Sequence, residues 1–274
     1  DTLVDTGHVN PESTRRLKSE LGGVERVVLT HPHIDHVGAS LTVPDVAARS
    51  HVVFDGMQET LRNFDDFVQA ARDEQVTLGS EGDVQRSPDE DYFPLDVAYA
   101  GDEISIDRVV EHGDSVRVGP YECEVIHTPG HASQHMALFH ADSGVMLSGD
   151  IVSRNGHYMF GAVQWDVGEY RLGLDRVGKR EPTLLLPGHG SVMTDPMARV
   201  EEAKAKADRA EQAILDIVNE TGPVGPRTLA RKAFDAGDET VDFLANVAAA
   251  YAIHLADQGR VRVQRQPEFA VRPL

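Results

Sequence analysis

The sequence feature that most constrains this chain is the run His31-Pro-His33-Ile-Asp35-His36, which follows an apolar stretch at 24–30 that predicts a strand. Neutral imidazole and carboxylate are the groups that a cation such as Zn²⁺ prefers as ligands. On a turn, residues 31 and 33 can point to one side while 35 and 36 point to another, so one segment could serve two ions. The alternative is a polar, His-rich surface loop.

Three later apolar runs favour the metal site over the surface loop. The runs at 122–128, 145–148 and 183–186 predict strands, and each is followed by a turn that contains a glycine and one ligand-type residue. Those residues are His131, Asp150 and His189. Sheets of α/β proteins build sites from loops at one edge, and glycines let the backbone approach closely. The sequence therefore predicts an α/β fold with a metal site at a sheet edge.

This order of motifs resembles the metallo-β-lactamase superfamily. The family pattern begins with an Asp at a strand end, continues with His-x-His-x-Asp-His, and ends with a single His, a single Asp and a last His. Here these are Asp5, the run 31–36, His131, Asp150 and His189. The resemblance covers about residues 1 to 200 and implies an αββα sandwich.

The resemblance also implies a ligand set for two divalent metal ions, with Zn²⁺ as the first candidate and Mn²⁺ or Fe as alternatives. The first ion would be held by His31, His33 and His131, the second by Asp35, His36 and His189, and Asp150 would bridge both. Asp5 is not a ligand in the family pattern. We expect it to hold the His-rich loop by hydrogen bonds.

The implied chemistry is hydrolysis by a hydroxide shared between the two ions. Asp35 and Asp150 are the candidate catalytic residues, because either could orient the water or receive its proton, although both could act as ligands alone. True β-lactamases generally lack an Asp at the position of Asp150, whereas glyoxalase II-like hydrolases and related nucleases have one. The first hypothesis is therefore a small thioester or ester substrate.

Other activities stay open. The same two ions would serve an endoribonuclease or phosphodiesterase acting on RNA. An iron-dependent persulfide dioxygenase would use one ion, and the complete second set of ligands argues against it. A purely regulatory DNA-binding module would not need seven ligands.

Two domains are predicted, a catalytic domain at 1–200 and a winged-helix-like domain at 201–274. Helical patterns at 197–219, 227–234 and 240–257 precede an alternating stretch from 260 that could pair with residues 269–271. Such helices followed by a β-wing resemble the module of the β-lactamase-like protein 2 branch. The N-terminal strands of the family are expected to be missing, because the chain starts directly at the Asp5 motif.

The predicted C-terminal domain carries a locally basic face on an acidic protein. Its basic residues are Arg227, Arg231, Lys232, Arg260, Arg262 and Arg265. Basic winged helices can contact phosphates. A structural lid or a dimer contact is the alternative.

The charge balance is strongly acidic, with 45 Asp and Glu against 26 Lys and Arg, and a net charge of −19. Lysine is rare among the basic residues, a composition that resembles haloarchaeal proteins. An acidic mesophilic protein is the alternative. The single cysteine, Cys123, excludes an intrachain disulfide and is expected to pack inside a strand. The sequence has no membrane span and no signal peptide pattern, so we expect a cytoplasmic protein.

Some further side chains are weaker candidates for the site. His157 and Tyr158 could donate a proton or a hydrogen bond to the substrate, although an exposed loop is the simpler interpretation. Five aromatic residues of the region 54–112 are expected to pack rather than to line a pocket: Phe64, Phe67, Tyr92, Phe93 and Tyr99. The remaining histidines are expected to be structural or exposed: His8, His51, His112, His127, His135, His140 and His254.

Overall fold

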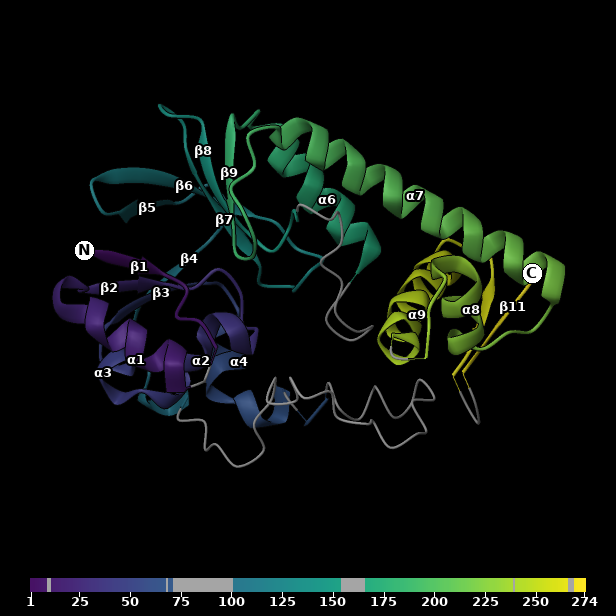
Figure 1. Cartoon of the computed structure of the whole chain (residues 1–274), viewed down its shortest axis with the longest axis horizontal. Coiled ribbons are helices and arrows are strands. Elements are labelled where there is room, and N and C mark those ends of the chain that lie inside the picture. The colour runs from purple at the N-terminus through teal and green to yellow at the C-terminus, as the bar shows by residue number, and fades with distance from the viewer. Residues whose placement is uncertain (9–10, 68, 71–100, 154–165, 239, 266–268) are drawn as a thin grey trace.

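Two β-sheets face each other between layers of helices (Figure 1). The computed structural model describes residues 1–274 except 9–10, 68, 71–100, 154–165, 239 and 266–268. The arrangement confirms the predicted α/β class. None of the helices within these described ranges is long and apolar enough to cross a lipid bilayer.

The first sheet has the strand order β1-β2-β3-β4, and all of its neighbouring strands are parallel. Its strands are β1 (Thr2–Val4), β2 (Arg26–Val28), β3 (Ser50–Phe54) and β4 (Ile106–Val110). Parallel strands that are covered on both faces have continuous apolar runs in their sequence. Val27, Val28 and Leu29 fit this pattern, since all three side chains are fully buried.

The second sheet has the order β5-β6-β7-β8-β9. Its strands are β5 (Ser115–Val118), β6 (Tyr121–His127), β7 (Met136–His140), β8 (Val145–Gly149) and β9 (Leu184–Pro187). Pairing is antiparallel from β5 to β8 and parallel between β8 and β9. Strands β6, β8 and β9 therefore run in the same direction, and their carboxyl ends meet at one edge.

A hydrophobic layer joins the two sheets. It includes Val28 and Val52 from the first sheet and Cys123, Val125 and Leu138 from the second. Burial raises the pKa of the Cys123 thiol. The predicted packing role of this cysteine is confirmed.

Helices cover the outer face of the first sheet. They are α1 (Pro11–Glu20), α2 (Ile34–Thr42), α3 (Pro44–Ala47) and α4 (Met57–Arg62), with short 3₁₀ turns at Leu21–Gly23 and Gly101–Glu103. Phe64 is buried in this layer, and Phe67 packs against it. Packing is thus confirmed for these two aromatic residues.

The His-rich run does not lie entirely in a turn, contrary to the sequence prediction. Helix α2 begins at Ile34, so that Asp35 and His36 occupy its first turn. His33 is the N-cap residue, with extended backbone angles (φ −70°, ψ 146°). Its carbonyl oxygen accepts hydrogen bonds from the backbone N–H groups of His36 and Val37, which starts the helix. The change from extended to helical backbone at Ile34 separates His31 and His33 from Asp35 and His36.

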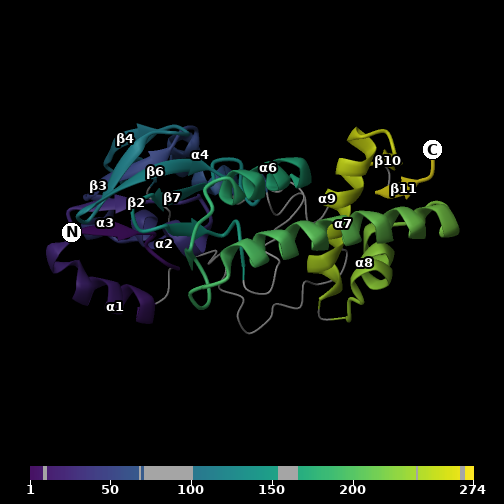
Figure 2. The same ribbon diagram turned by 90° about the horizontal axis from the view of Figure 1, so that it is seen from above.

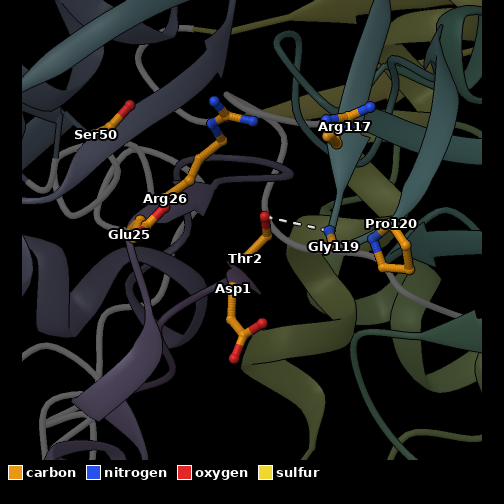
Figure 3. Close-up of a pocket in the computed structure, with 8 residues that line it drawn as sticks. All are labelled: Asp1, Thr2, Glu25, Arg26, Ser50, Arg117, Gly119 and Pro120. Carbon is orange, nitrogen blue, oxygen red and sulfur yellow. Dashed lines mark hydrogen bonds between the residues drawn. The ribbon is translucent and has the colours of Figure 1, made fainter.

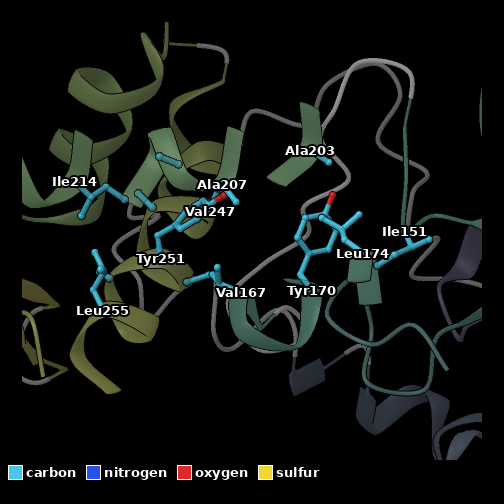
Figure 4. Close-up of a cluster of buried hydrophobic side chains, with 14 of the residues drawn as sticks. Ile151, Val167, Tyr170, Leu174, Ala203, Ala207, Ile214, Val247, Tyr251 and Leu255 are labelled. Carbon is cyan, nitrogen blue, oxygen red and sulfur yellow. The ribbon is translucent and has the colours of Figure 1, made fainter. Parts of the chain in front are cut away.

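Helices α6 (Val167–Gly178) and α7 (Pro196–Thr221) cover the second sheet, and α7 continues far beyond it towards the C-terminal elements (Figure 2). One hydrophobic cluster extends from this sheet through both helices to the C-terminal part (Figure 4). Ile151, Tyr170, Ile214 and Tyr251 belong to it. Helix α7 spans the predicted domain limit at residue 200, and the division into two domains stays a prediction.

The C-terminal elements follow the predicted order. Helix α8 (Pro226–Phe234) is followed by α9 (Val241–Asp257), and an antiparallel hairpin of β10 (Arg262–Gln264) and β11 (Ala270–Arg272) comes last. Helix α7 ends where Gly222 adopts a φ of +78°, a value that glycine reaches without a steric penalty.

Candidate metal centre

All seven predicted ligands lie together, because the segments that carry them leave the same edge of the two sheets. The loops after β2, β6, β8 and β9 carry five of them, and the first turn of α2 carries Asp35 and His36. They form two groups whose potential ligand atoms lie within 4.8 Å of one another. The first group is His31, His33 and His131, and the second is Asp35, His36, Asp150 and His189.

The first group is closed to solvent. His31 and His131 are fully buried, and His33 is 5% exposed. The Nε2 atoms of His31 and His131 face each other at 3.2 Å. Two imidazole nitrogens bound to one tetrahedral Zn²⁺ at the usual bond length are about 3.3 Å apart. The three imidazoles therefore have the donor set and the spacing that a divalent cation requires.

The second group is open on one side. His189 Nε2 lies 2.8 Å from Asp35 Oδ2 and 3.2 Å from His36 Nε2. The His189 side chain is 41% exposed, whereas that of His36 is 3% exposed. A ligand could approach the centre from the His189 side.

Asp150 lies between the two groups. Its Oδ2 atom is 3.4 Å from the Nε2 atoms of both His36 and His189, and 3.6 Å from Nε2 of His131. Its other oxygen, Oδ1, is buried, and no residue that the structure describes donates a hydrogen bond to it. A buried carboxylate oxygen without a donor is costly unless a cation is bound. The residues thus fit the two divalent ions that the sequence implies.

Asp5 orients one imidazole of each group. Its Oδ2 accepts a hydrogen bond from His36 Nδ1 (2.8 Å) and another from the hydroxyl of Thr30 (2.8 Å), while its Oδ1 accepts from the Thr30 backbone N–H (2.7 Å). The Thr30 hydroxyl oxygen lies 3.0 Å from His31 Nδ1 and, since its own proton goes to Asp5, accepts from that nitrogen. Both imidazoles then direct the Nε2 lone pair into the centre. The predicted role of Asp5 is confirmed by these contacts.

The charges of the centre shift its pKa values in opposite directions. Burial alone would raise the pKa of Asp150, but hydrogen bonds from His189 and His36 lower it well below its ordinary value. Hydrogen bonds to Asp150 and Asp35 raise the pKa of His189 to about 9. Burial would lower the pKa of His36, but the carboxylates of Asp5 and Asp150 outweigh it and raise that pKa well above the usual range. In the metal-free protein the carboxylates therefore stabilise the protonated, positively charged forms of His36 and His189.

His31 behaves differently from His36. Burial, reinforced by the neighbouring imidazoles, lowers the pKa of His31 well below its ordinary value. Neutral imidazole is the form that binds a cation. His31 therefore does not have to lose a proton before the first group binds an ion.

His135 also belongs to the centre, where the sequence predicts only a structural or exposed residue. It is fully buried, and its ring centroid lies 5.0 Å from that of His31. Burial lowers the pKa of His135 to about 3. A signal was present in the sequence, because His135 immediately precedes an apolar strand and follows His131 in the same ligand-bearing loop.

Gly188 leaves space that the centre needs. A Cβ atom at this position would lie 2.3 Å from Asp150 Oδ1 and 2.7 Å from His36 Cε1. We therefore expect Gly188→Ala to displace Asp150 and to weaken metal binding at least tenfold, with about 1–3 kcal/mol of lost stability. A metal titration together with thermal unfolding of the variant measures both effects.

Gly22→Ala is the matched control for that substitution, because an added Cβ there meets no atom within 4 Å. Metal affinity equal to wild type in Gly188→Ala would contradict the assigned position of Asp150.

Other residues discussed from the sequence lie away from the centre or outside the described ranges. His157, Tyr158, Tyr92, Phe93 and Tyr99 lie outside the described residues. His51 is fully buried on β3 and bonds to Ser40 and to the backbone of Arg49. His127 stacks on Phe54 at a centroid distance of 4.3 Å. A structural role is confirmed for these two histidines.

A cavity of about 680 Å³ lies at the amino ends of the strands, away from the metal centre (Figure 3). Arg26 and Arg117 line it together with Asp1 and Glu25, and the Gly119 backbone N–H donates to the Thr2 hydroxyl across it. None of the described residues that line it belongs to the predicted ligand set.

Comparison with known proteins identifies the family. The family model described as "Metallo-beta-lactamase superfamily" matches residues 1–189. The chain belongs to the metallo-β-lactamase superfamily. As a member of this superfamily with metallo-hydrolase relatives, it is a metal-dependent hydrolase.

Relatives of this superfamily member are distant in sequence. "Probable metallo-hydrolase YqjP" of Bacillus subtilis is 28% identical over 80% of this chain and 73% of its own length. "Beta-lactamase-like protein 2 homolog" of Drosophila melanogaster is 24% identical over 78% of this chain, which spans 62% of that protein's length. A local match, 47% identical over 45 residues (16% of this chain and 18% of the relative), links it to "Hydroxyacylglutathione hydrolase" of Chelativorans.

A solved structure supports the fold over almost the whole chain. The crystal structure of a metallo-β-lactamase family protein from Thermus thermophilus has a TM-score of 0.79 and 21% sequence identity. The match covers 99% of this chain and 89% of the other. The superfamily fold and the C-terminal elements therefore occur together in another protein.

Proposed function

We propose that this protein is a binuclear metal-dependent hydrolase whose two ions share Asp150. The observation that carries this proposal is the position of Asp150 Oδ2, which lies 3.4–3.6 Å from imidazole nitrogens of both groups. Carboxylates that bind two ions occupy such a place between two donor sets. The cofactor proposed is a pair of divalent ions, with Zn²⁺ first and Mn²⁺ or Fe as alternatives.

Each group has a separate role in this proposal. His31, His33 and His131 would hold one ion, and Asp35, His36 and His189 the other. When bound, the ions would lower the pKa of a coordinated water and polarise the scissile carbonyl oxygen. Asp35 lies at the open side beside His189, where its carboxylate could orient the attacking water or take its proton.

The substrate class proposed is a small thioester or ester. The local similarity to a hydroxyacylglutathione hydrolase supports it, since that match is the most identical segment among the relatives described above. The one cysteine, Cys123, is buried between the sheets and cannot serve as a nucleophile. Hydrolysis by a water molecule is consistent with this arrangement.

Substrate choice is tested by a side-by-side assay of the metal-loaded protein. A generic S-acyl thioester and a single-stranded RNA are offered under the same conditions, with chelator-treated protein as the control. Thioester turnover that chelator abolishes supports the proposal. RNA cleavage without thioester turnover would replace it by the nuclease alternative.

An endoribonuclease activity is the second candidate, and one observation on the C-terminal hairpin favours it. Arg262 and Arg272 are exposed and lie directly opposite each other in the pairing of β10 and β11. Like charges opposite each other destabilise a hairpin unless an anion lies between them. In this alternative the C-terminal part is a winged-helix-like module that contacts RNA phosphates.

Other basic residues of that face are paired with acids. Arg227 bonds to Asp242, and Arg231 lies 2.6 Å from Asp238. The paired side chains are less available to phosphate, which is why RNA is the second candidate. The double variant Arg262→Gln/Arg272→Gln should lose RNA binding while thioester turnover stays unchanged.

Metal binding is expected to depend on pH through His189. Its pKa of about 9 in the metal-free protein means that a proton must leave before a cation binds. Affinity for the ion of the second group should therefore rise between pH 6.5 and 9, by up to about tenfold per unit for each displaced proton. Metal titrations at three pH values in this range check it, and a flat profile would contradict it.

Stability of the metal-free protein should show the opposite trend. The folded pKa of His189 lies above the unfolded value of 6.5, so its stabilising contribution is present below pH 6.5 and is lost as the pH rises to about 9. Thermal unfolding of chelator-treated protein across this range separates this effect from metal loss.

From the net charge of −19 we also propose that the protein is of haloarchaeal origin and works in a cytoplasm of high salt. Unscreened repulsion should destabilise the folded chain at low ionic strength. We expect the unfolding temperature to rise as KCl is raised from about 0.1 M to about 2 M. A temperature indifferent to salt would contradict the proposal.

A further inference from the structure

The ring of His135 lies where three ligand-bearing segments meet. The backbone N–H of Asp150 donates to His135 Nε2 at 2.9 Å, and His135 Nδ1 lies 2.7 Å from the hydroxyl oxygen of Thr128. The next residue, Met136, donates its backbone N–H to the carbonyl oxygen of Thr30. One imidazole thus connects the end of β8 with the end of β6, beside the start of the His-rich run.

These hydrogen bonds decide which ring nitrogen carries the proton. Because Nε2 accepts from the Asp150 backbone, the proton is on Nδ1, which donates to the hydroxyl of Thr128. Both nitrogens are therefore occupied by the protein. His135 is not a metal ligand in this arrangement, although its ring centroid lies only 5.0 Å from that of His31 and 5.8 Å from that of His131.

The residue before Asp150 is adapted to this imidazole. Gly149 has a φ of +49°, and a Cβ at this position would lie 2.6 Å from His135 Nε2. Only glycine leaves room for the ring at the point where the strand ends. On the other side, the Gly149 carbonyl oxygen accepts the backbone N–H of Gly188 at 2.9 Å. The peptide that carries Asp150 is thus held from two sides.

We propose that His135 is a positioning residue that fixes the backbone of Asp150 and thereby places its carboxylate between the two ion-binding groups. This inference rests on the proposed function, because it concerns how the shared ligand is held. His135 acts through Asp150 and touches neither the substrate nor the ions. The role requires an acceptor at Nε2, which a glutamine side chain can also supply.

Three variants test this role: His135→Leu, His135→Gln and His51→Leu. Leucine removes the acceptor for the Asp150 N–H, whereas the Oε1 atom of glutamine can replace it. His51 is the matched control, because it is equally buried and bonded through both nitrogens but has no contact with a proposed ligand. Zinc affinity is measured by competition with a chromophoric chelator, and hydrogen exchange of the Asp150 amide is measured on metal-free protein.

We expect His135→Leu to bind the second zinc ion about 10–100-fold more weakly than wild type, the usual effect of removing a group that orients a ligand. His135→Gln should stay within about threefold of wild type, and the Asp150 amide should exchange faster only in the leucine variant. His51→Leu should lose thermal stability without a change in zinc affinity.

Two results would overturn the inference. One is equal zinc affinity in His135→Leu and wild type, and the other is a glutamine variant as weak as the leucine variant. Wild-type protein that binds neither zinc nor Mn²⁺ or Fe²⁺ would instead defeat the proposed function. The amide-exchange comparison still decides the role of His135 in that case, and unchanged exchange in His135→Leu would refute it.

Discussion

Replacing Asp150 with asparagine is expected to reduce the bound metal from two ions per chain to one or none and to lower hydrolysis about 100-fold or more. The neutral amide keeps the size of the side chain but removes the charge that both groups share, and several kcal/mol of transition-state stabilisation depend on the ions. The carboxylate is 1% exposed, with no described donor to Oδ1, so water cannot replace it easily. Metal analysis and the thioester assay measure the two effects.

Asp142→Asn is the control for this substitution. Asp142 is an exposed carboxyl in the turn between β7 and β8, so the same chemical change should leave metal content and turnover as in wild type. Retention of two tightly bound ions by Asp150→Asn would contradict the shared-ligand assignment.

The second large effect is expected for Asp5→Asn. This carboxylate accepts hydrogen bonds from His36 Nδ1 and from the hydroxyl that in turn accepts from His31 Nδ1. Asparagine has one acceptor oxygen instead of two, so its NH₂ group must face either the His36 and Thr30 side chains or the Thr30 backbone N–H, and the network that orients one imidazole of each group is disrupted. We expect the affinity for both ions to fall about 10–100-fold. Stepwise metal titration measures each ion separately.

Thr30→Val separates the two arms of that network. It removes the hydroxyl between Asp5 and His31 and leaves the direct bond from Asp5 to His36 in place. The first group should weaken more than the second in this variant, whereas Asp5→Asn weakens both. If Thr30→Val and Asp5→Asn had the same profile, the separate orientation of His36 by Asp5 would be wrong.

Much of the centre could be predicted because its residues follow a simple physical pattern. An apolar run that ends in a glycine and a His or Asp predicts both a strand and the functional residue that follows it. In the structure, His131, Asp150 and His189 follow strands β6, β8 and β9 in this way. Parallel β8 and β9 bring two of these ends to the same edge. Local sequence is sufficient where a strand and its loop are adjacent.

Other features could not be predicted from the apolar runs, because they depend on backbone hydrogen bonds and ion pairs that the apolar pattern does not show. The start of α2 at Ile34 depends on the carbonyl oxygen of His33, so a run expected in a turn is half helical. His135 has the same apolar neighbours as many core histidines, and only the approach of the Asp150 backbone gives it a role. Likewise, the pairing of Arg227 with Asp242 removes a charge that the sequence counts as free.

A crystal structure of the protein grown with zinc, with anomalous diffraction recorded at the zinc edge, would show directly whether two ions share Asp150. We expect two anomalous peaks about 3.5–4 Å apart, one beside His31, His33 and His131 and one beside Asp35, His36 and His189, with Asp150 in contact with both. A single peak, or two peaks of which only one contacts Asp150, would contradict it.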